Sequence, residues 1–222
     1  MKFSMKAQAE PALAIGGMEA SADSPAIKSV MDFSLAVFGL IATLPLFAVI
    51  SCLIKLSSPG PVLYRQVRSG RDGRQFSLLK FRSMVVGAEE GQYALAELNE
   101  ASGPAFKIKK DPRIIPGIGT FIRKFGLDEL PQFINVLRGE MSIVGPRPPT
   151  PSEVEKYEPW QRRRLSVKPG LTCIWQIQPA RNEITFERWM DMDMHYIDHR
   201  SLRLDLAIIL KTIPAILLGH GR

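Results

Sequence analysis

The chain has 222 residues, enough for one domain with a substantial core and hardly enough for two. A formal net charge of +7 favours anionic partners such as phosphates and anionic lipids, while 45% hydrophobic and 23% charged residues are ordinary for a folded protein. Two widely separated cysteines give no disulfide framework. No basic stripe with interleaved aromatic residues is visible, so we expect no nucleic acid as a partner.

A long uncharged segment follows an N-terminal tail, which we place at residues 1–27 because it is rich in Ala, Gly and Ser and lacks helical periodicity. Residues 33–54 are 22 positions without a charge, which would extend roughly 33 Å as a straight helix. Pro45 lies in the middle, where proline removes a helical hydrogen bond. The residues alone leave two alternatives for the membrane element at 28–56: a kinked spanning helix, or a re-entrant helix that breaks at Pro45 and returns to its own side.

The rest of the chain, residues 57–222, mixes strand and helix patterns and predicts an α/β (α+β) domain. Residues 62–67 and 75–81 predict two strands of a β-hairpin around Gly70-Arg71-Asp72-Gly73. We expect helices over 88–99, 118–125, 131–137, 152–165 and 200–218. In the helix at 118–125 the apolar residues share one face, which suits a core helix or a helix at a membrane surface.

Two adjacent carboxylates, Asp128 and Glu129, precede Pro131, and Arg147 follows between two prolines. Successive helical residues point about 100° apart, so the two carboxylates cannot share one helical face. One interpretation is capping, because acidic groups and proline favour a helix start. The other is chemical: a carboxylate nucleophile, a metal-binding carboxylate and an arginine for phosphate are what phosphoryl-type transfer requires.

Several motifs follow one another along the chain in this order: Lys80-Phe81-Arg82-Ser83-Met84, Asp111-Pro112-Arg113, Leu127-Asp128-Glu129-Leu130-Pro131-Gln132, Asn135-Val136-Leu137-Arg138-Gly139-Glu140-Met141-Ser142, Gly145-Pro146-Arg147-Pro148 and Lys168-Pro169-Gly170-Leu171-Thr172. In this order they resemble the bacterial monotopic phosphoglycosyl transferases, also called bacterial sugar transferases. The resemblance extends from about Lys28 to the C-terminus. Any one motif alone would be weak, and the ordered set makes the resemblance specific.

The resemblance implies a small monotopic, membrane-associated catalytic domain at 57–222, with the re-entrant form of the helix at 28–56, the hairpin and amphipathic interface helices. It implies transfer of a sugar 1-phosphate, which we expect to be a hexose 1-phosphate, from a UDP-sugar to undecaprenyl phosphate. This reaction starts exopolysaccharide or other glycoconjugate synthesis on the cytoplasmic face of the bacterial inner membrane. The expected partners are UDP-sugar, undecaprenyl phosphate and membrane lipid, and a homodimer is left open.

The resemblance also assigns roles to residues. Asp128 would be the nucleophile of a covalent phosphosugar intermediate, with release of UMP. Glu129, together with Asp128, would bind Mg²⁺, which prefers hard oxygen ligands; whether Glu129 is also a base is left open. Arg147 offers a planar fork of donors to a phosphate. The other residues expected to bind substrate are Lys80, Arg82, Arg113, Pro146, Pro148 and Gln176.

Some of these assignments have a simpler alternative. Lys80 and Arg82 alternate along a strand and share a face, either as phosphate contacts or as solvated charges. Arg113 equally suits a substrate contact or an ion pair that holds its loop. Cys173 stands where the family pattern often has Gly, and Pro179-Ala180 stands where it often has a Ser-Gly pair, so we expect this region to shape the choice of sugar or nucleotide.

Other features of the chain are weaker indicators of function. His195 and His199 are four residues apart, a spacing common by chance, and we expect no metal there. Two functions remain as alternatives: a membrane-surface, metal-dependent phosphohydrolase that uses the same carboxylates, and a non-enzymatic basic membrane-binding protein in which they cap a helix.

Overall fold

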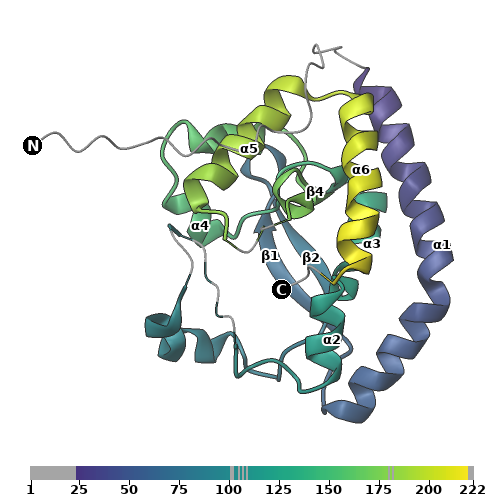
Figure 1. The fold of residues 1–222 in the computed structure, drawn as a ribbon, viewed down its shortest axis with the longest axis vertical. Coiled ribbons are helices and arrows are strands. Elements are labelled where there is room, and N and C mark those ends of the chain that lie inside the picture. The colour runs from purple at the N-terminus through teal and green to yellow at the C-terminus, as the bar shows by residue number, and fades with distance from the viewer. Residues whose placement is uncertain are drawn as a thin grey trace, which may run out of the picture.

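Helices flank a small antiparallel hairpin in the computed structural model, which describes residues 24–100, 103, 104, 106, 108, 110–179, 181 and 183–219 (Figure 1). The domain therefore mixes helices and strands, as predicted. The helices are α1 (Pro25–Ser57), α2 (Ile118–Lys124), α3 (Gln132–Leu137), α4 (Pro151–Glu155), α5 (Phe186–His199) and α6 (Leu202–Leu217). The strands are β1 (Leu63–Ser69), β2 (Gln75–Phe81), β3 (Ser142–Val144) and β4 (Gly170–Thr172). The 3₁₀ segments are η1 (Arg71–Gly73), η2 (Glu90–Leu98), η3 (Leu127–Glu129), η4 (Gln161–Ser166) and η5 (Trp175–Ile177).

The long helix α1 has 33 residues and continues through Pro45. It already includes residues 25–27 of the expected tail, and the part of that tail before residue 24 lies outside the described residues. Figure 1 shows that α1 bends about midway along its length. The predicted break at Pro45 is wrong, because a proline removes only one bond of the helical ladder and a packed helix accommodates the loss by a kink. Thr43 Oγ1 also donates to the Gly39 carbonyl at 2.6 Å, one turn before the proline region.

One face of α1 packs on the domain and the other is exposed and apolar. Ala36, Ile50 and Ile54 are buried, while Phe38 and Leu56 remain 71% and 79% exposed. Gly39 permits close contact with α3, since a Cβ there would lie 2.6 Å from the Phe133 ring. By length and composition, α1 is the one helix in the described part of the chain that could cross a membrane.

The predicted hairpin is confirmed: β1 and β2 pair antiparallel from Leu63 opposite Phe81 to Ser69 opposite Gln75. The free side of β2 is held by Asn135, which is fully buried on α3. Its Oδ1 accepts a hydrogen bond from Leu79 N at 3.0 Å, and its Nδ2 donates to Ser77 O at 2.8 Å. The edge of the strand is therefore satisfied by one side chain, which fixes the position of β2 over α3.

A second, smaller strand pair was not predicted from the sequence. β3 and β4 pair in parallel, with Ser142 opposite Gly170 and Val144 opposite Thr172. The backbone at the start of β4 lies very close to the residue that follows β3: a Cβ on Gly170 would lie 2.1 Å from the Gly145 nitrogen. Strands of three residues carry too little alternation to be recognised in sequence, although the two glycines mark the contact.

Three predicted helices differ from the structure. The helix predicted at 152–165 is two pieces, α4 and η4, because Pro159 disfavours helical backbone at the residue before it. The α-helix predicted at 88–99 is the 3₁₀ segment η2. The helix predicted at 200–218 begins later, at Leu202, where Ser201 accepts a hydrogen bond from Leu204 N and caps the first turn.

Candidate active site

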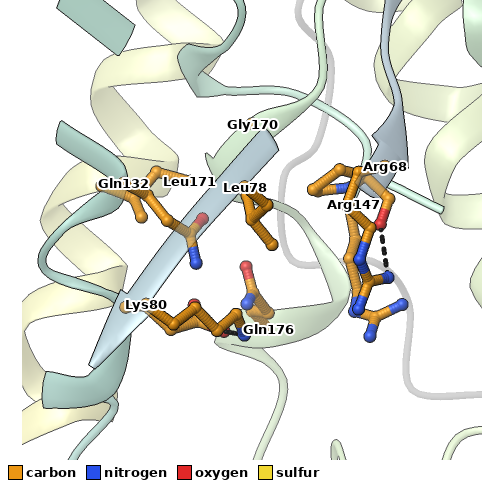
Figure 2. Close-up of a pocket in the computed structure, with 10 residues that line it drawn as sticks. Arg68, Leu78, Lys80, Gln132, Arg147, Gly170, Leu171 and Gln176 are labelled. Carbon is orange, nitrogen blue, oxygen red and sulfur yellow. Dashed lines mark hydrogen bonds and ion pairs between the residues drawn. The ribbon is translucent and has the colours of Figure 1, made fainter. Parts of the chain in front are cut away.

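A polar cleft with about 250 Å³ of free space, part of it open to solvent, lies where the hairpin meets the loop after β3. Figure 2 shows Arg68 and Arg147 together on one side of this cleft and Lys80 and Gln132 on the other, with Gln176 between them. The lining residues are Arg68, Leu78, Lys80, Glu129, Gln132, Arg147, Pro148, Gly170, Leu171 and Gln176.

The carboxylate pair lies on η3, directly before α3. Asp128 is buried, with 7% of its surface exposed, and Glu129 Oε1 lies 2.8 Å from Lys80 Nζ. Pro131 occupies the N-cap position of α3 and makes no side-chain capping hydrogen bond. Both carboxylates lie before that position, in the first turn of η3, so neither is the N-cap residue of α3.

Burial and neighbouring charges act in opposite directions on this group. Burial raises the pKa of Asp128 above its ordinary value, and the Glu129 carboxylate adds to that rise, while the Lys80 ammonium opposes it. Burial likewise lowers the pKa of Lys80, and Glu129 opposes that shift. The Lys80 ammonium thus offsets part of the rise in the pKa of the buried Asp128 carboxylate.

The segment after β3 is fixed through its carbonyls. It contains three prolines, at 146, 148 and 149, which have no N–H to donate. The carbonyls of residues 146 to 149 instead accept from Gly170 N, Arg164 Nη2, Arg68 Nη1 and Ser69 N, each at 2.9 Å. Four consecutive carbonyls are held by donors from β4, η4 and β1, so the backbone that carries Arg147 is rigidly placed.

Two arginines face the cleft beside this segment. Burial and the nearby Arg147 cation lower the pKa of Arg68 to about 10. Glu153 lies 4.0 Å from Arg68 Nη1 and 3.8 Å from Arg147 Nη1, so one carboxylate is shared between the two guanidinium groups. Together with Lys80 across the cleft, these cations make the site suited to a strongly anionic ligand.

Two residues expected to bind substrate have structural positions instead. Arg82 is buried and its guanidinium donates to the carbonyls of Ser58 and Pro59, which ties the end of α1 to the hairpin. Arg113 forms a bidentate ion pair with Asp111, at 2.8 and 2.6 Å. Neither lines the cleft. For Arg113 the structure shows the ion-pair alternative, since its fork is used by a carboxylate two residues away.

Other predicted residues lie at or next to the cleft. Pro148 and Gln176 line it, and Pro146 anchors its wall through a carbonyl bond to Gly170. Buried Cys173 donates to Gln176 Oε1 at 3.3 Å, so it orients a cleft-lining amide. The pattern change at Pro179-Ala180 falls partly outside the described residues, because Ala180 is not among them.

Sequence reasoning missed Arg68, Gln132 and Arg181. Arg68 and Gln132 line the cleft, and Arg181 is close enough to Glu129 and Asp128 for their charges to act on it. Only Gln132 lies inside a matched motif, which is the signal that could have found it. An arginine in an ordinary strand or loop carries no such mark in the sequence.

The described residues contain no group of three or more His, Cys, Asp or Glu side chains that could hold a metal ion. His195 and His199 stack on each other, with ring centroids 4.3 Å apart. Mg²⁺ commonly needs only one or two protein carboxylates, with substrate phosphates and water completing its shell. Asp128 and Glu129, next to a cleft lined by cations, fit that donor set.

Comparison with known proteins gives a consistent result. The sequence model of the family described as bacterial sugar transferase matches residues 23–219. Galactosyl transferase CpsE of Streptococcus agalactiae is 50% identical over 162 residues, 73% of this chain and 36% of that protein. Exopolysaccharide production protein ExoY of Sinorhizobium fredii is 40% identical over 201 residues, 87% of each chain. The UDP-glucose:undecaprenyl-phosphate glucose-1-phosphate transferase of Escherichia coli is 39% identical over 194 residues, 84% of this chain and 39% of that protein. The chain thus spans most of ExoY but less than two fifths of the other two relatives.

Proposed function

The chain belongs to the bacterial sugar transferase family of enzymes, and from this premise we propose that it transfers a sugar 1-phosphate from a UDP-sugar to undecaprenyl phosphate. The name of the Escherichia coli relative supports both substrates, and that of ExoY supports a role in exopolysaccharide production. The relatives are named for glucose and for galactose, so a hexose 1-phosphate is the proposed group.

One observation carries the proposal: the buried carboxylate of Asp128 is next in sequence to Glu129, which lines a cleft whose other residues are suited to phosphate, although Asp128 itself is not among the lining residues. The Lys80 ammonium lowers the pKa of that carboxylate and so favours its ionised form, against the effect of burial, and Arg68 and Arg147 present guanidinium groups across the cleft. A diphosphate needs several cations to offset its charge, and a nucleophile held by the fold needs no reorganisation before attack.

We infer two steps. An Asp128 oxygen attacks the phosphorus next to the sugar, the bond from that phosphorus to the bridging oxygen breaks, and UMP leaves with the bond's electrons. This forms an acyl phosphate that links the sugar phosphate to Asp128. An oxygen of undecaprenyl phosphate then attacks the same phosphorus, and the Asp128 carboxylate leaves. The product is the diphosphate-linked sugar lipid, and the enzyme is regenerated.

Arg147 and Arg68 would bind the phosphate oxygens through planar forks of donors, and their charges would stabilise negative charge that accumulates during transfer. Glu129, with Asp128, would hold Mg²⁺, which when bound supplies neutralisation of the diphosphate charge. Gln176, oriented by Cys173, would donate to the ligand from its amide nitrogen.

The exposed apolar surface of two helices supports the proposed placement at a membrane. The outward face of α1 and the exposed leucines and isoleucines of α6 are large apolar areas that water does not favour. We propose that both face the lipid at the cytoplasmic side of the inner membrane, where UDP-sugars are available and the headgroup of undecaprenyl phosphate is within reach.

Incubation of the purified chain with Mg²⁺ and UDP-glucose or UDP-galactose, with and without undecaprenyl phosphate, tests this function. We expect continuous release of UMP only with the lipid, together with an equal amount of lipid-linked sugar. Without the lipid, release should stop after about one UMP per enzyme molecule. Continuous release of UMP without the lipid would instead support the phosphohydrolase, and no release with any nucleotide sugar would contradict the proposed enzyme.

A further inference from the structure

A buried ion pair behind the cleft has no part in the two steps described above. Arg164 on η4 and Asp193 on α5 lie 2.7 Å apart, and their side chains are only 1% and 2% exposed. Arg164 is thus almost completely removed from solvent, although it lies in a run of three arginines. A buried pair is a weak source of stability, because the cost of removing both charges from water offsets their attraction. Its presence is better explained by what it holds in place.

The pair holds the backbone of Arg147. Arg164 Nη2 donates to the Arg147 carbonyl at 2.9 Å, one of the four carbonyl bonds that fix the segment after β3. Asp193 Oδ2 lies 2.7 Å from the same Nη2 atom and holds the guanidinium at this point. Among those four bonds, this one is made at Arg147 itself, so its loss would move that residue directly.

The helix that carries Asp193 also supports the Arg147 side chain. Trp189 precedes Asp193 by one helical turn on α5, so both face the same way. The Arg147 guanidinium lies 5.4 Å from the centre of the Trp189 ring, and Arg164 lies 5.3 Å from it. Helix α5 therefore fixes Arg147 at two points, at its guanidinium through Trp189 and at its carbonyl through Asp193 and Arg164.

We propose that Arg164 and Asp193 are positioning residues, which act on phosphate binding and transfer by fixing Arg147 at the cleft. The proposal rests on the proposed function in so far as Arg147 binds phosphate. The hydrogen bond by which the pair holds the Arg147 carbonyl in the Pro146–Pro149 segment does not depend on a bound substrate.

The test replaces the pair by apolar residues of similar size. Such replacements of buried ion pairs are often neutral or stabilising, so the Arg164→Met/Asp193→Leu variant should fold with little change in Tm. Its kcat should fall about 10- to 100-fold, as expected for a displaced group that stabilises the transition state. The matched control is Arg163→Gln/Asp198→Asn, which removes an exposed ion pair between the same two elements and should change neither quantity.

Two further measurements separate positioning from general stability. In an Arg147→Ala background the apolar replacement should lower kcat further by less than about threefold, because the effects of residues that act through one group are not additive. Hydrogen exchange needs no substrate: the amides of Gly145 and Gly170, which donate to the carbonyls of Thr172 and Pro146, should exchange about tenfold faster in the apolar variant and not in the control. If the apolar variant does not fold, Arg164→Lys keeps the charge but not the fork, and should show the same changes to a smaller extent.

The outcomes are distinct. Unchanged exchange at Gly145 and Gly170 in the apolar variant would overturn the positioning role, whatever its activity. A fall in kcat that is as large in the Arg147→Ala background as in the unmodified chain would also overturn it. If exchange rises as expected but no nucleotide sugar is turned over even by the unmodified chain, the positioning role stands and the proposed function fails.

Discussion

At the scale of single residues, Asp128 combines burial with the proposed nucleophilic role. We expect Asp128→Asn to abolish turnover, because an amide of nearly the same shape is a poor nucleophile. The matched control is Asp72→Asn, in an exposed turn where φ is 58° and asparagine is tolerated. Assays of UMP release for both variants decide the matter, and near-normal turnover by Asp128→Asn would remove the covalent step.

The same substitution has a predicted effect on stability. The folded-state pKa of Asp128 lies above its ordinary value of 3.8, so folding favours the protonated form. Stability is therefore lost as pH rises from about 4 through the raised pKa, and the neutral amide escapes this loss. Thermal melts should show that Asp128→Asn raises Tm at pH 7 and that the gain shrinks toward pH 4.

Lys80 should control the pH dependence of the reaction. Its ammonium lowers the pKa of Asp128, so Lys80→Met should raise it and leave less of the nucleophile ionised. We expect the acid limb of kcat/KM to move to higher pH and the rate at pH 7 to fall about 10- to 100-fold. Lys80→Arg, which keeps a cation, is the control. An acid limb at the same pH in all three proteins would show that Lys80 does not act on this carboxylate.

The residues of the cleft were predictable where they lie inside ordered motifs. Lys80, Glu129, Arg147 and Pro148 lie inside those motifs and were expected, as was Gln176 just beyond the last motif, and the structure brings all five to one cleft. Arg68 was not, because its role depends on the register of β1 against the carbonyl of Pro148, which no local pattern records. Arg82 and Arg113 look the same in sequence as phosphate-binding arginines, and only their partners reveal a structural role.

At the scale of elements, local periodicity predicted the hairpin and the short helix at α3. It failed where a distant contact decides the structure. The parallel pair of β3 and β4 joins segments almost 30 residues apart, and its three-residue strands depend on the close approach of Gly145 and Gly170. The helix expected at 152–165 is longer than either helical piece that forms, because Pro159 disfavours helical backbone at the residue before it.

The contact of α1 with α3 can be tested at Gly39. A side chain there must displace the Phe133 ring, so Gly39→Leu should destabilise the domain by about 2 kcal/mol and lower Tm by roughly 4–8 °C. Ala42→Leu on the exposed face of the same helix is the control for added apolar surface. Phe133→Ala in the Gly39→Leu background should recover part of the loss. Equal melting of Gly39→Leu and Ala42→Leu would contradict close packing at this point.

At the scale of the whole molecule, both ends of α1 are attached to the same domain. Near its start, Lys28 Nζ lies 2.6 Å from Asp205 on α6, and Asp32 accepts a hydrogen bond from Ile143 N at 3.1 Å. Near its end, Ile54 is fully buried and Lys55 Nζ donates to Gly60 O at 2.9 Å. A bilayer core is about 30 Å thick, so a spanning α1 would have to carry one of these ends away from the domain.

The cost of that separation argues for a re-entrant path. A spanning helix would break the contacts of Lys28 and Asp32. The buried Asp205 carboxylate would keep the hydrogen bond from Tyr196 Oη but would lose the Lys28 ammonium that pairs with it. Breaking a buried ion pair on one side typically costs about 3–5 kcal/mol. A bent helix that enters and leaves on one side keeps both sets of contacts while its outward apolar face meets lipid, and the bend of α1 is compatible with this path (Figure 1).

We therefore predict that the N-terminus and the catalytic domain lie on the same, cytoplasmic, side. A cysteine at residue 10 (Glu10→Cys) and one at exposed Arg162 (Arg162→Cys) should both escape a membrane-impermeant thiol reagent in intact cells and both react after lysis. The background carries Cys52→Ser, because Cys52 is exposed, whereas Cys173 is buried. Labelling of residue 10 but not of residue 162 in intact cells would show that α1 crosses the membrane, and the contacts at its first turn would then have to break on insertion.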